Sequence, residues 1–125
     1  MTFDQDNLSR RNCELCDEKG TILYRSLSDF AFKYRTLIHD PKGRLLAYVQ
    51  KDISQEDVVV FCDPDDHYLG RLTGKKDALV TFGDEEPLSV SSLVKISSGA
   101  MEVYEEKDLF KAVLILCAGI EMVRE

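Results

Sequence analysis

Apolar and polar positions recur with a 23-residue spacing through the first half of the chain. Three turn segments begin at Asp17, Asp40 and Asp63, and apolar residues flank each of them on both sides. The middle segment, Asp40-Pro-Lys-Gly43, carries Asp first, Pro second and Gly fourth, which are the preferences of a type I turn. A three-residue hairpin loop closes on a left-handed residue, a conformation that glycine adopts without strain. The pattern therefore predicts three β-hairpins, over roughly residues 12–26, 34–50 and 57–72.

The same loop geometry predicts which residues face each other across the hairpins. With Asp40 opposite Arg44, Ile38 should lie opposite Leu46. The third copy has Asp66 where glycine stands in the others, and aspartate enters the left-handed region more readily than most residues. Opposed residues of a hairpin share one face of the sheet, so these pairs should form one continuous apolar surface. The equivalent pairs in the other hairpins are Leu15 with Leu23 and Phe61 with Leu69.

Further strands follow the three repeats. Ala78–Phe82 and Leu88–Ile96 flank a turn-rich segment that ends at Pro87, and we expect them to form a fourth hairpin. Ala100–Tyr104 predicts one more strand. The apolar connection Ser26–Phe32 is compatible with either a bridging turn or a short helix.

The C-terminal end of the chain has a different pattern. Ala112–Ile120 is a run of nine apolar residues without a break. A surface helix would show polar residues every three or four positions, so a helix here must be buried on nearly all sides. The run is shorter than the roughly 20 residues that a membrane-spanning helix needs. We expect a buried helix over about residues 106–123, with one more buried strand as the alternative.

These elements predict a mostly β fold. We expect about 8–10 antiparallel strands in successive hairpins, which form a barrel or a strongly bent sheet around the buried C-terminal helix. Residues 1–11 are polar and mixed in charge, and predict a flexible lead-in. Residues 12–125 then form a single domain, since a chain of this length holds one sizeable core.

The charge balance limits the classes of partner. The chain has a formal net charge of −7 and a pI near 4.8. An acidic protein repels phosphates, so we expect no nucleic-acid partner. Acidity fits high solubility, and it also fits a basic protein partner. The tightest cationic group, Arg71, Lys75 and Lys76, is a candidate anionic-ligand patch, although such a group is also typical of a solvated loop.

The expected redox state of the four cysteines depends on the cellular compartment. The N-terminus has no apolar stretch of the signal-peptide kind, so we expect a cytoplasmic protein with four reduced thiols. Cys13 and Cys16 have the spacing of half a zinc ribbon. The second pair that a structural zinc site needs is missing, and strand alternation would point Cys13 and Cys16 to opposite faces. Two ordinary strand cysteines are therefore favoured over zinc.

Two other kinds of site are weakly indicated. Asp63, Asp65 and Asp66 suggest calcium, but an EF-hand loop that starts at Asp63 would need a glutamate where Gly74 stands. Turn chemistry accounts for these aspartates. Nucleophilic catalysis is also weakly supported, because both histidines lie beside turn residues and neither is matched to a nucleophile. The sequence therefore predicts a non-enzymatic protein that needs no cofactor.

Three segments together resemble a known family. They are Thr36–Tyr48, Val59–Arg71 and Asp108–Glu121, and they are similar to the hairpin units and apolar C-terminal helix of the tubby C-terminal-like group. That group includes phospholipid scramblases and LURP-one-related proteins. The resemblance implies a barrel, usually of twelve strands, threaded by the helix; this chain would be a reduced or divergent version. No binding residue of the family matches a position here.

Two hypotheses on function follow. The resemblance implies a non-enzymatic binding module that engages lipid headgroups or a membrane surface, with the protein peripheral to the membrane. Arg71, Lys75 and Lys76 would then contact the anionic headgroup. The acidic balance supports the alternative, a small protein-interaction factor of the inhibitor or immunity kind that binds a basic protein.

Overall fold

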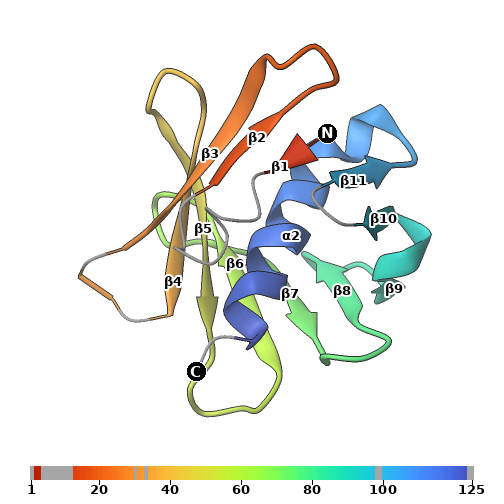
Figure 1. The fold of residues 1–125 in the computed structure, drawn as a ribbon. Helices are drawn as coiled ribbons and strands as arrows, with labels where there is room; N and C mark the ends of the chain where they lie inside the picture. Colours follow the sequence, from red (N-terminus) through yellow and green to blue (C-terminus); the bar gives the residue numbers. More distant parts are fainter. Residues whose placement is uncertain (1, 4–12, 30, 33, 98–99, 124–125) are drawn as a thin grey trace.

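A single antiparallel sheet wraps around a C-terminal helix (Figure 1). The computed structural model describes residues 2–3, 13–29, 31–32, 34–97 and 100–123. The strand order across the sheet is β10-β11-β1-β2-β3-β4-β5-β6-β7-β8-β9. Strands that follow each other in the chain are therefore neighbours in the sheet, except β9 and β10, and β11 pairs with β1. Helix α2, Leu109–Val123, lies against the concave face.

The elements have the following bounds. The strands are β1 (Thr2–Phe3), β2 (Cys13–Cys16), β3 (Ile22–Ser28), β4 (Arg35–His39), β5 (Leu45–Lys51), β6 (Val58–Cys62), β7 (Tyr68–Thr73), β8 (Leu79–Phe82), β9 (Leu88–Ser89), β10 (Val94–Ser97) and β11 (Ala100–Val103), and the 3-10 helices are η1 (Val90–Ser92) and η2 (Glu106–Asp108). Two of the eleven described strands, β1 and β9, are only two residues long. The other nine correspond to the eight to ten that the sequence predicts.

The three predicted turns adopt the expected backbone geometry. Gly20, Gly43 and Asp66 close them with φ of +85°, +87° and +67°, all in the left-handed region. In the middle turn, the N–H of Asp40 donates to the carbonyl of Arg44 at 3.0 Å. The Arg44 and Lys42 N–H groups donate to the Asp40 carboxylate, and with the Arg44 charge they hold the pKa of Asp40 below its usual range. The prediction of turn type is confirmed, including the aspartate that replaces glycine.

The predicted pairing beyond the turns is wrong by one residue. Ile38 lies opposite Ala47 rather than Leu46, because a β-bulge shifts the register between Ile38 and His39. The same shift recurs in the other two hairpins, so that Leu15 lies opposite Tyr24 and Phe61 opposite Gly70. A bulge inserts one residue on one strand, and that strand bends and twists more strongly as a result.

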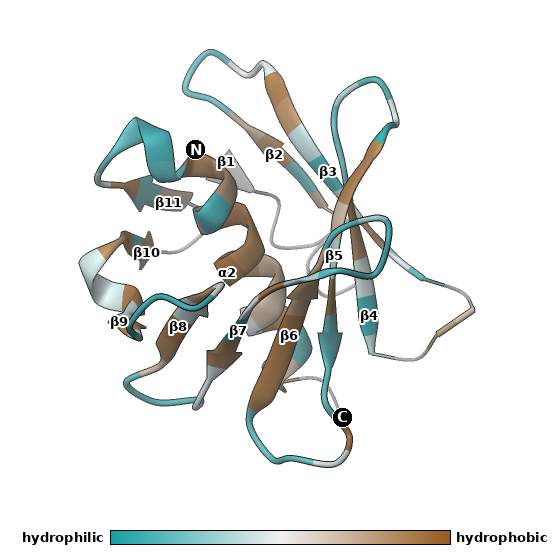
Figure 2. Ribbon diagram, turned by 180° about the vertical axis from the view of Figure 1, so that it is seen from behind, coloured by the Kyte–Doolittle hydropathy of each residue, from teal (hydrophilic) through white to brown (hydrophobic). Residues whose placement is uncertain are grey.

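The repeated bulges occur in three consecutive hairpins of a sheet that curves around the helix. The side chains on its inner face and on α2 are mostly apolar, and the buried apolar ones form one core (Figure 2). The fully buried members with the largest side chains are Phe61, Leu15, Ile38, Met101, Met122, Glu121, Val49, Val59, Val80, Val113 and Cys117. All of them except Glu121 are apolar. The bent sheet therefore removes from water both its own inner face and the helix that it surrounds.

The sheet bends strongly but does not close. Of the two predicted arrangements, the barrel is therefore wrong and the bent sheet is the one present. β9 and β10 form its two edges, and no ladder joins them among the described residues. The predicted fourth hairpin also differs. Only Leu88–Ser89 pairs with β8, after which the chain turns through η1 and pairs as β10 with β11. The Ser92 hydroxyl donates to the Ser89 carbonyl at 2.6 Å, a local bond of the kind that competes with a strand ladder.

The helix prediction is confirmed. η2 and α2 together cover residues 106–123, and every residue from Ala112 to Ala118 is buried. The connection after β3 is a loop wherever it is described: the Asp29 carboxylate accepts the N–H of Ala31 at 2.8 Å. Of the predicted lead-in, the described residues Thr2–Phe3 form β1, which joins β11 to β2. The rest of that segment lies outside the described residues.

Gly70 on β7 leaves no room for a side chain. It lies opposite Phe61 on β6 and Phe82 on β8, whose rings are 5.9 Å apart between centroids. A Cβ atom on Gly70 would lie 2.2 Å from the carbonyl oxygen of Thr81. No side chain fits at this position unless the backbone moves.

Replacing Gly70 by alanine should lower the free energy of unfolding by about 1–3 kcal/mol, because an added methyl overpacks the site. Gly119 is the matched control. It lies in α2, nothing comes within 4 Å of an added Cβ, and Gly119→Ala should stabilise the protein by about 0.5–1 kcal/mol. Urea unfolding followed by circular dichroism measures both changes. Equal effects of the two substitutions would contradict the packing described for Gly70.

A buried polar contact ties the helix to the sheet. Glu121 on α2 is 0% exposed, and the hydroxyl of Thr36 on β4 donates to its Oε1 at 2.5 Å. Thr36 is itself buried, at 3% exposure. Since a buried carboxylate without hydrogen bonds is strongly unfavourable, the contact specifies where the last turns of α2 meet the sheet.

Thr36→Val keeps the shape of the side chain but removes the donor, and it should cost about 1–3 kcal/mol of unfolding free energy. Thr36→Ser keeps the hydroxyl and loses one methyl, which should cost about 0.8 kcal/mol. Thermal and urea unfolding of the two variants measure the difference. A valine variant as stable as the serine variant would show that the hydroxyl contributes nothing.

Candidate functional site

A hollow in the surface lies where the first hairpin, the last hairpin and the start of the helix meet. Its volume is about 830 Å³. Its lining comes from the β2–β3 turn and β3, from β10 and β11, from η2 and from the first residue of α2. We call it the acidic hollow, and its lining residues are Asp17, Glu18, Lys19, Leu23, Ser97, Ala100, Met101, Glu102, Val103, Glu106 and Leu109.

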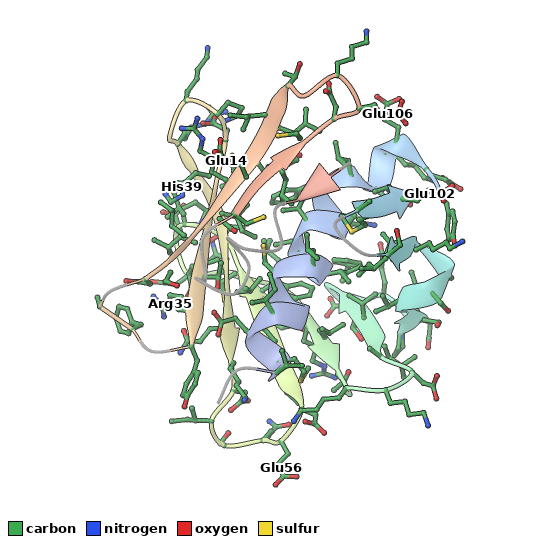
Figure 3. The ribbon with its side chains drawn as sticks, in the orientation of Figure 1. Glu14, Arg35, His39, Glu56, Glu102 and Glu106 are labelled. Atoms are coloured by element: carbon green, nitrogen blue, oxygen red, sulfur yellow. The ribbon has the colours of Figure 1, made fainter. Side chains whose placement is uncertain are left out.

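The charges in the acidic hollow are unbalanced, with four carboxylates and one lysine. Glu102 and Glu106 lie at the same end of the molecule (Figure 3), and both are exposed, as is Glu18. These three carboxylates form no ion pair with another residue of the described ranges. Two nearby glutamates do have ion-pair partners. Glu14 Oε2 lies 3.6 Å from Arg25 Nε, and Glu105 Oε2 lies 3.1 Å from Lys107 Nζ. The negative charge of the hollow is therefore available to a cation from outside the described chain.

The floor of the acidic hollow is apolar. Leu23 stands at the bulge of β3, and Met101 on β11 is buried. Leu109 is the first residue of α2. These three residues come from an N-terminal hairpin, a C-terminal hairpin and a helix, which is why sequence reasoning missed the site. The only local signal in the sequence is the group of acidic residues Glu105, Glu106 and Asp108 just before the helix.

The sequence-predicted cationic patch lies elsewhere. Arg71 is exposed on β7, and Lys75 and Lys76 stand in the turn between β7 and β8. The Lys75 ammonium lies 3.7 Å from the Asp57 carboxylate, and the backbone N–H of Gly74 donates to the backbone carbonyl of Asp57 at 2.8 Å. One of the three cations is thus partly neutralised within the protein.

In the third turn, the Asp63 carboxylate accepts hydrogen bonds from the backbone. One Asp63 oxygen accepts the N–H groups of Asp65 and His67, each at 2.9 Å, and the other lies 3.2 Å from His67 Nδ1. The His67 N–H contributes most to holding the pKa of Asp63 below its usual range. Ligand atoms of Asp63, Asp65 and His67 lie within 4.8 Å of one another, but calcium needs six to eight oxygen ligands. The turn itself accounts for this arrangement.

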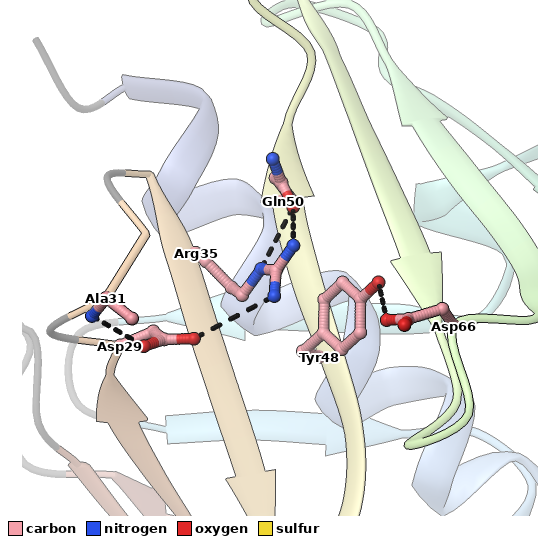
Figure 4. Close-up of polar contacts among 6 residues, drawn as sticks. All are labelled: Asp29, Ala31, Arg35, Tyr48, Gln50 and Asp66. Carbon is pink, nitrogen blue, oxygen red and sulfur yellow. Dashed lines mark hydrogen bonds and ion pairs between the residues drawn. The ribbon is translucent and has the colours of Figure 1, made fainter.

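A polar and aromatic cluster covers the outer face of β4 and β5 (Figure 4). The Arg35 guanidinium lies between the rings of Phe32 and Tyr48, 4.0 and 4.2 Å from their centroids. It donates to Gln50 Oε1 and lies 3.9 Å from an oxygen of Asp29. With its charge and donors engaged, Arg35 holds the β3–β4 loop on the sheet. The hollow beside Tyr48 and Gln50 is small, about 220 Å³.

The cysteine positions follow strand and helix burial. Cys13 is buried with Leu15 on the inner face of β2, and Cys16 is partly exposed at the end of the strand. Burial raises the pKa of the Cys117 thiol on α2 to about 12, so this thiol stays protonated at neutral pH. A protonated thiol is neither a nucleophile nor a metal ligand. Among the described residues, Cys13 and Cys16 belong to no group of three or more metal-ligating side chains.

No protein-family model, curated protein or solved structure matches this chain. No helix among the described residues is long and apolar enough to cross a membrane.

Proposed function

We propose that this protein is a non-enzymatic binding module whose partner is a basic protein. The observation that carries the proposal is the acidic hollow, where Glu18, Glu102 and Glu106 are exposed and form no ion pair within the described residues. Carboxylates that are not neutralised internally keep their full attraction for a cationic surface. The net charge of −7 acts in the same direction at longer range, since it raises the rate at which a basic protein is captured.

A lipid headgroup is the second candidate ligand. Its support is the resemblance to tubby-like and scramblase-like proteins together with the exposed cations Arg71 and Lys76. Each basic residue near an anionic membrane contributes about 1 kcal/mol of attraction. Because Lys75 is paired with Asp57, this patch offers two cations that are less engaged, against a net charge of −7 that opposes anionic lipid. The basic protein partner is therefore the stronger of the two proposals.

The basic partner is tested by affinity capture with matched charge variants. Glu102→Lys with Glu106→Lys reverses charge at the acidic hollow, whereas Glu56→Lys with Glu86→Lys makes the same change elsewhere. Glu56 lies at the far end of the molecule (Figure 3). Mass spectrometry of the captured proteins should show basic proteins held by the wild type and by the Glu56 and Glu86 variant but lost from the hollow variant.

The loss should also follow salt, because exposed ion pairs are screened as ionic strength rises. Recovery of the wild-type protein alone would overturn the proposal of a basic partner. If both variants capture the same proteins, the charge of the acidic hollow does not select the partner.

The lipid proposal is tested by flotation with vesicles of neutral lipid and with vesicles that contain phosphatidylserine, at low salt. Binding only to the phosphatidylserine vesicles, reduced about fivefold or more by Arg71→Gln with Lys76→Gln, is the expected result, given about 1 kcal/mol per cation. Lys95→Gln with Lys111→Gln is the charge-matched control. Equal recovery with both kinds of vesicle would end the lipid proposal.

A further inference from the structure

The geometry points to a particular kind of partner segment: we propose that the acidic hollow binds a short, lysine- or arginine-rich peptide segment that also carries apolar side chains. This inference rests on the proposed function and narrows it, from a basic protein in general to an amphipathic cationic segment at a stated place.

The apolar floor is the first argument. Five of the eleven lining residues are apolar: Leu23, Ala100, Met101, Val103 and Leu109. A bare metal ion or a polyamine would leave this floor unused, whereas an apolar side chain of a peptide would cover it.

The rim is the second argument. Glu18 approaches from the β2–β3 turn, and Glu102 and Glu106 approach from β11 and η2. A cationic segment in the hollow would therefore meet carboxylates from both the N-terminal and the C-terminal part of the chain. These carboxylates lack ion-pair partners among the described residues, in contrast to Glu14 and Glu105 nearby, which have them. The charge complementarity thus selects a cationic occupant, and the floor selects one with apolar side chains.

The size of the hollow is the third argument. A volume of about 830 Å³ lies in the upper part of the range for sites that enclose small organic ligands, about 300–1,000 Å³. Such a volume takes several side chains of a peptide. Neither a single ion nor a whole folded domain matches it.

The test uses the full chain and three probes at low salt: a short peptide of lysines with interspersed leucines, the same peptide with serine in place of leucine, and spermine. Fluorescence anisotropy or calorimetry measures the affinities. We expect the leucine peptide to bind at least about tenfold more tightly than the serine peptide, because burial of apolar side chains adds to the charge attraction.

Substitutions locate the site at which the peptide binds. Glu102→Gln with Glu106→Gln should weaken the leucine peptide about tenfold or more, and Glu56→Gln with Glu86→Gln should change it less than about twofold. Leu23→Ser should remove the preference for leucine over serine. Leu27→Ser, on the same strand but 44% exposed and not part of the hollow, should leave the preference intact. The melting temperature of each variant separates a binding defect from unfolding.

The outcomes distinguish the narrower inference from the proposed function. Equal affinity for the leucine and serine peptides, or insensitivity of binding to Glu102 and Glu106, would overturn the inference, while capture of basic proteins would still support the function. Failure of all three cationic probes, together with recovery of the wild-type protein alone in the capture experiment, would overturn both.

Discussion

Burial of helix α2 is the constraint on which the rest of the structure depends. Its residues from Ala112 to Ala118 are all buried, so the helix needs apolar partners on nearly every side. A flat sheet covers one side of a helix only. The three bulges at equivalent places in the first three hairpins supply the required bend, because each inserts one residue and increases the local twist. The hairpin repeat and the apolar helix therefore stabilise each other.

The connection between the last hairpin and the other strands of the open sheet matters as much as the curvature of the sheet. The last hairpin, β10–β11, is linked to the other strands through the two-residue strand β1, and β9 and β10 remain as edges. Close to that weak junction, the turn after β2, the strand β11 and the start of α2 surround the acidic hollow. Of its apolar lining residues, Met101 belongs to the core of the protein and Val103 packs against that core. The acidic hollow thus lies beside the junction of β11, β1 and β2, and it combines apolar lining residues with exposed carboxylates.

The sequence predicted what depends on local chemistry. The three turns, the left-handed Asp66 and the buried helix all follow from residue preferences and from a nine-residue apolar run. Pairing beyond the turns was wrong because a bulge depends on how neighbouring strands curve, and Leu46 itself carries no sign of it. Leu88–Ile96 does not form one strand, because the chain turns at Val90–Ser92, where the Ser92 hydroxyl donates to the Ser89 carbonyl.

The acidic hollow could not be predicted from the sequence, because residues 18, 23, 102 and 109 meet only after folding. Mapping of backbone amide chemical shifts, with isotope-labelled protein titrated with the lysine and leucine peptide, tests its role most directly. We expect the largest changes at Lys19, Leu23, Glu102 and Glu106, with little change at Arg71 and Lys76. Changes that are largest around Arg71 and Lys76, or that spread evenly over all exposed carboxylates, would contradict the assignment of the acidic hollow as the binding surface.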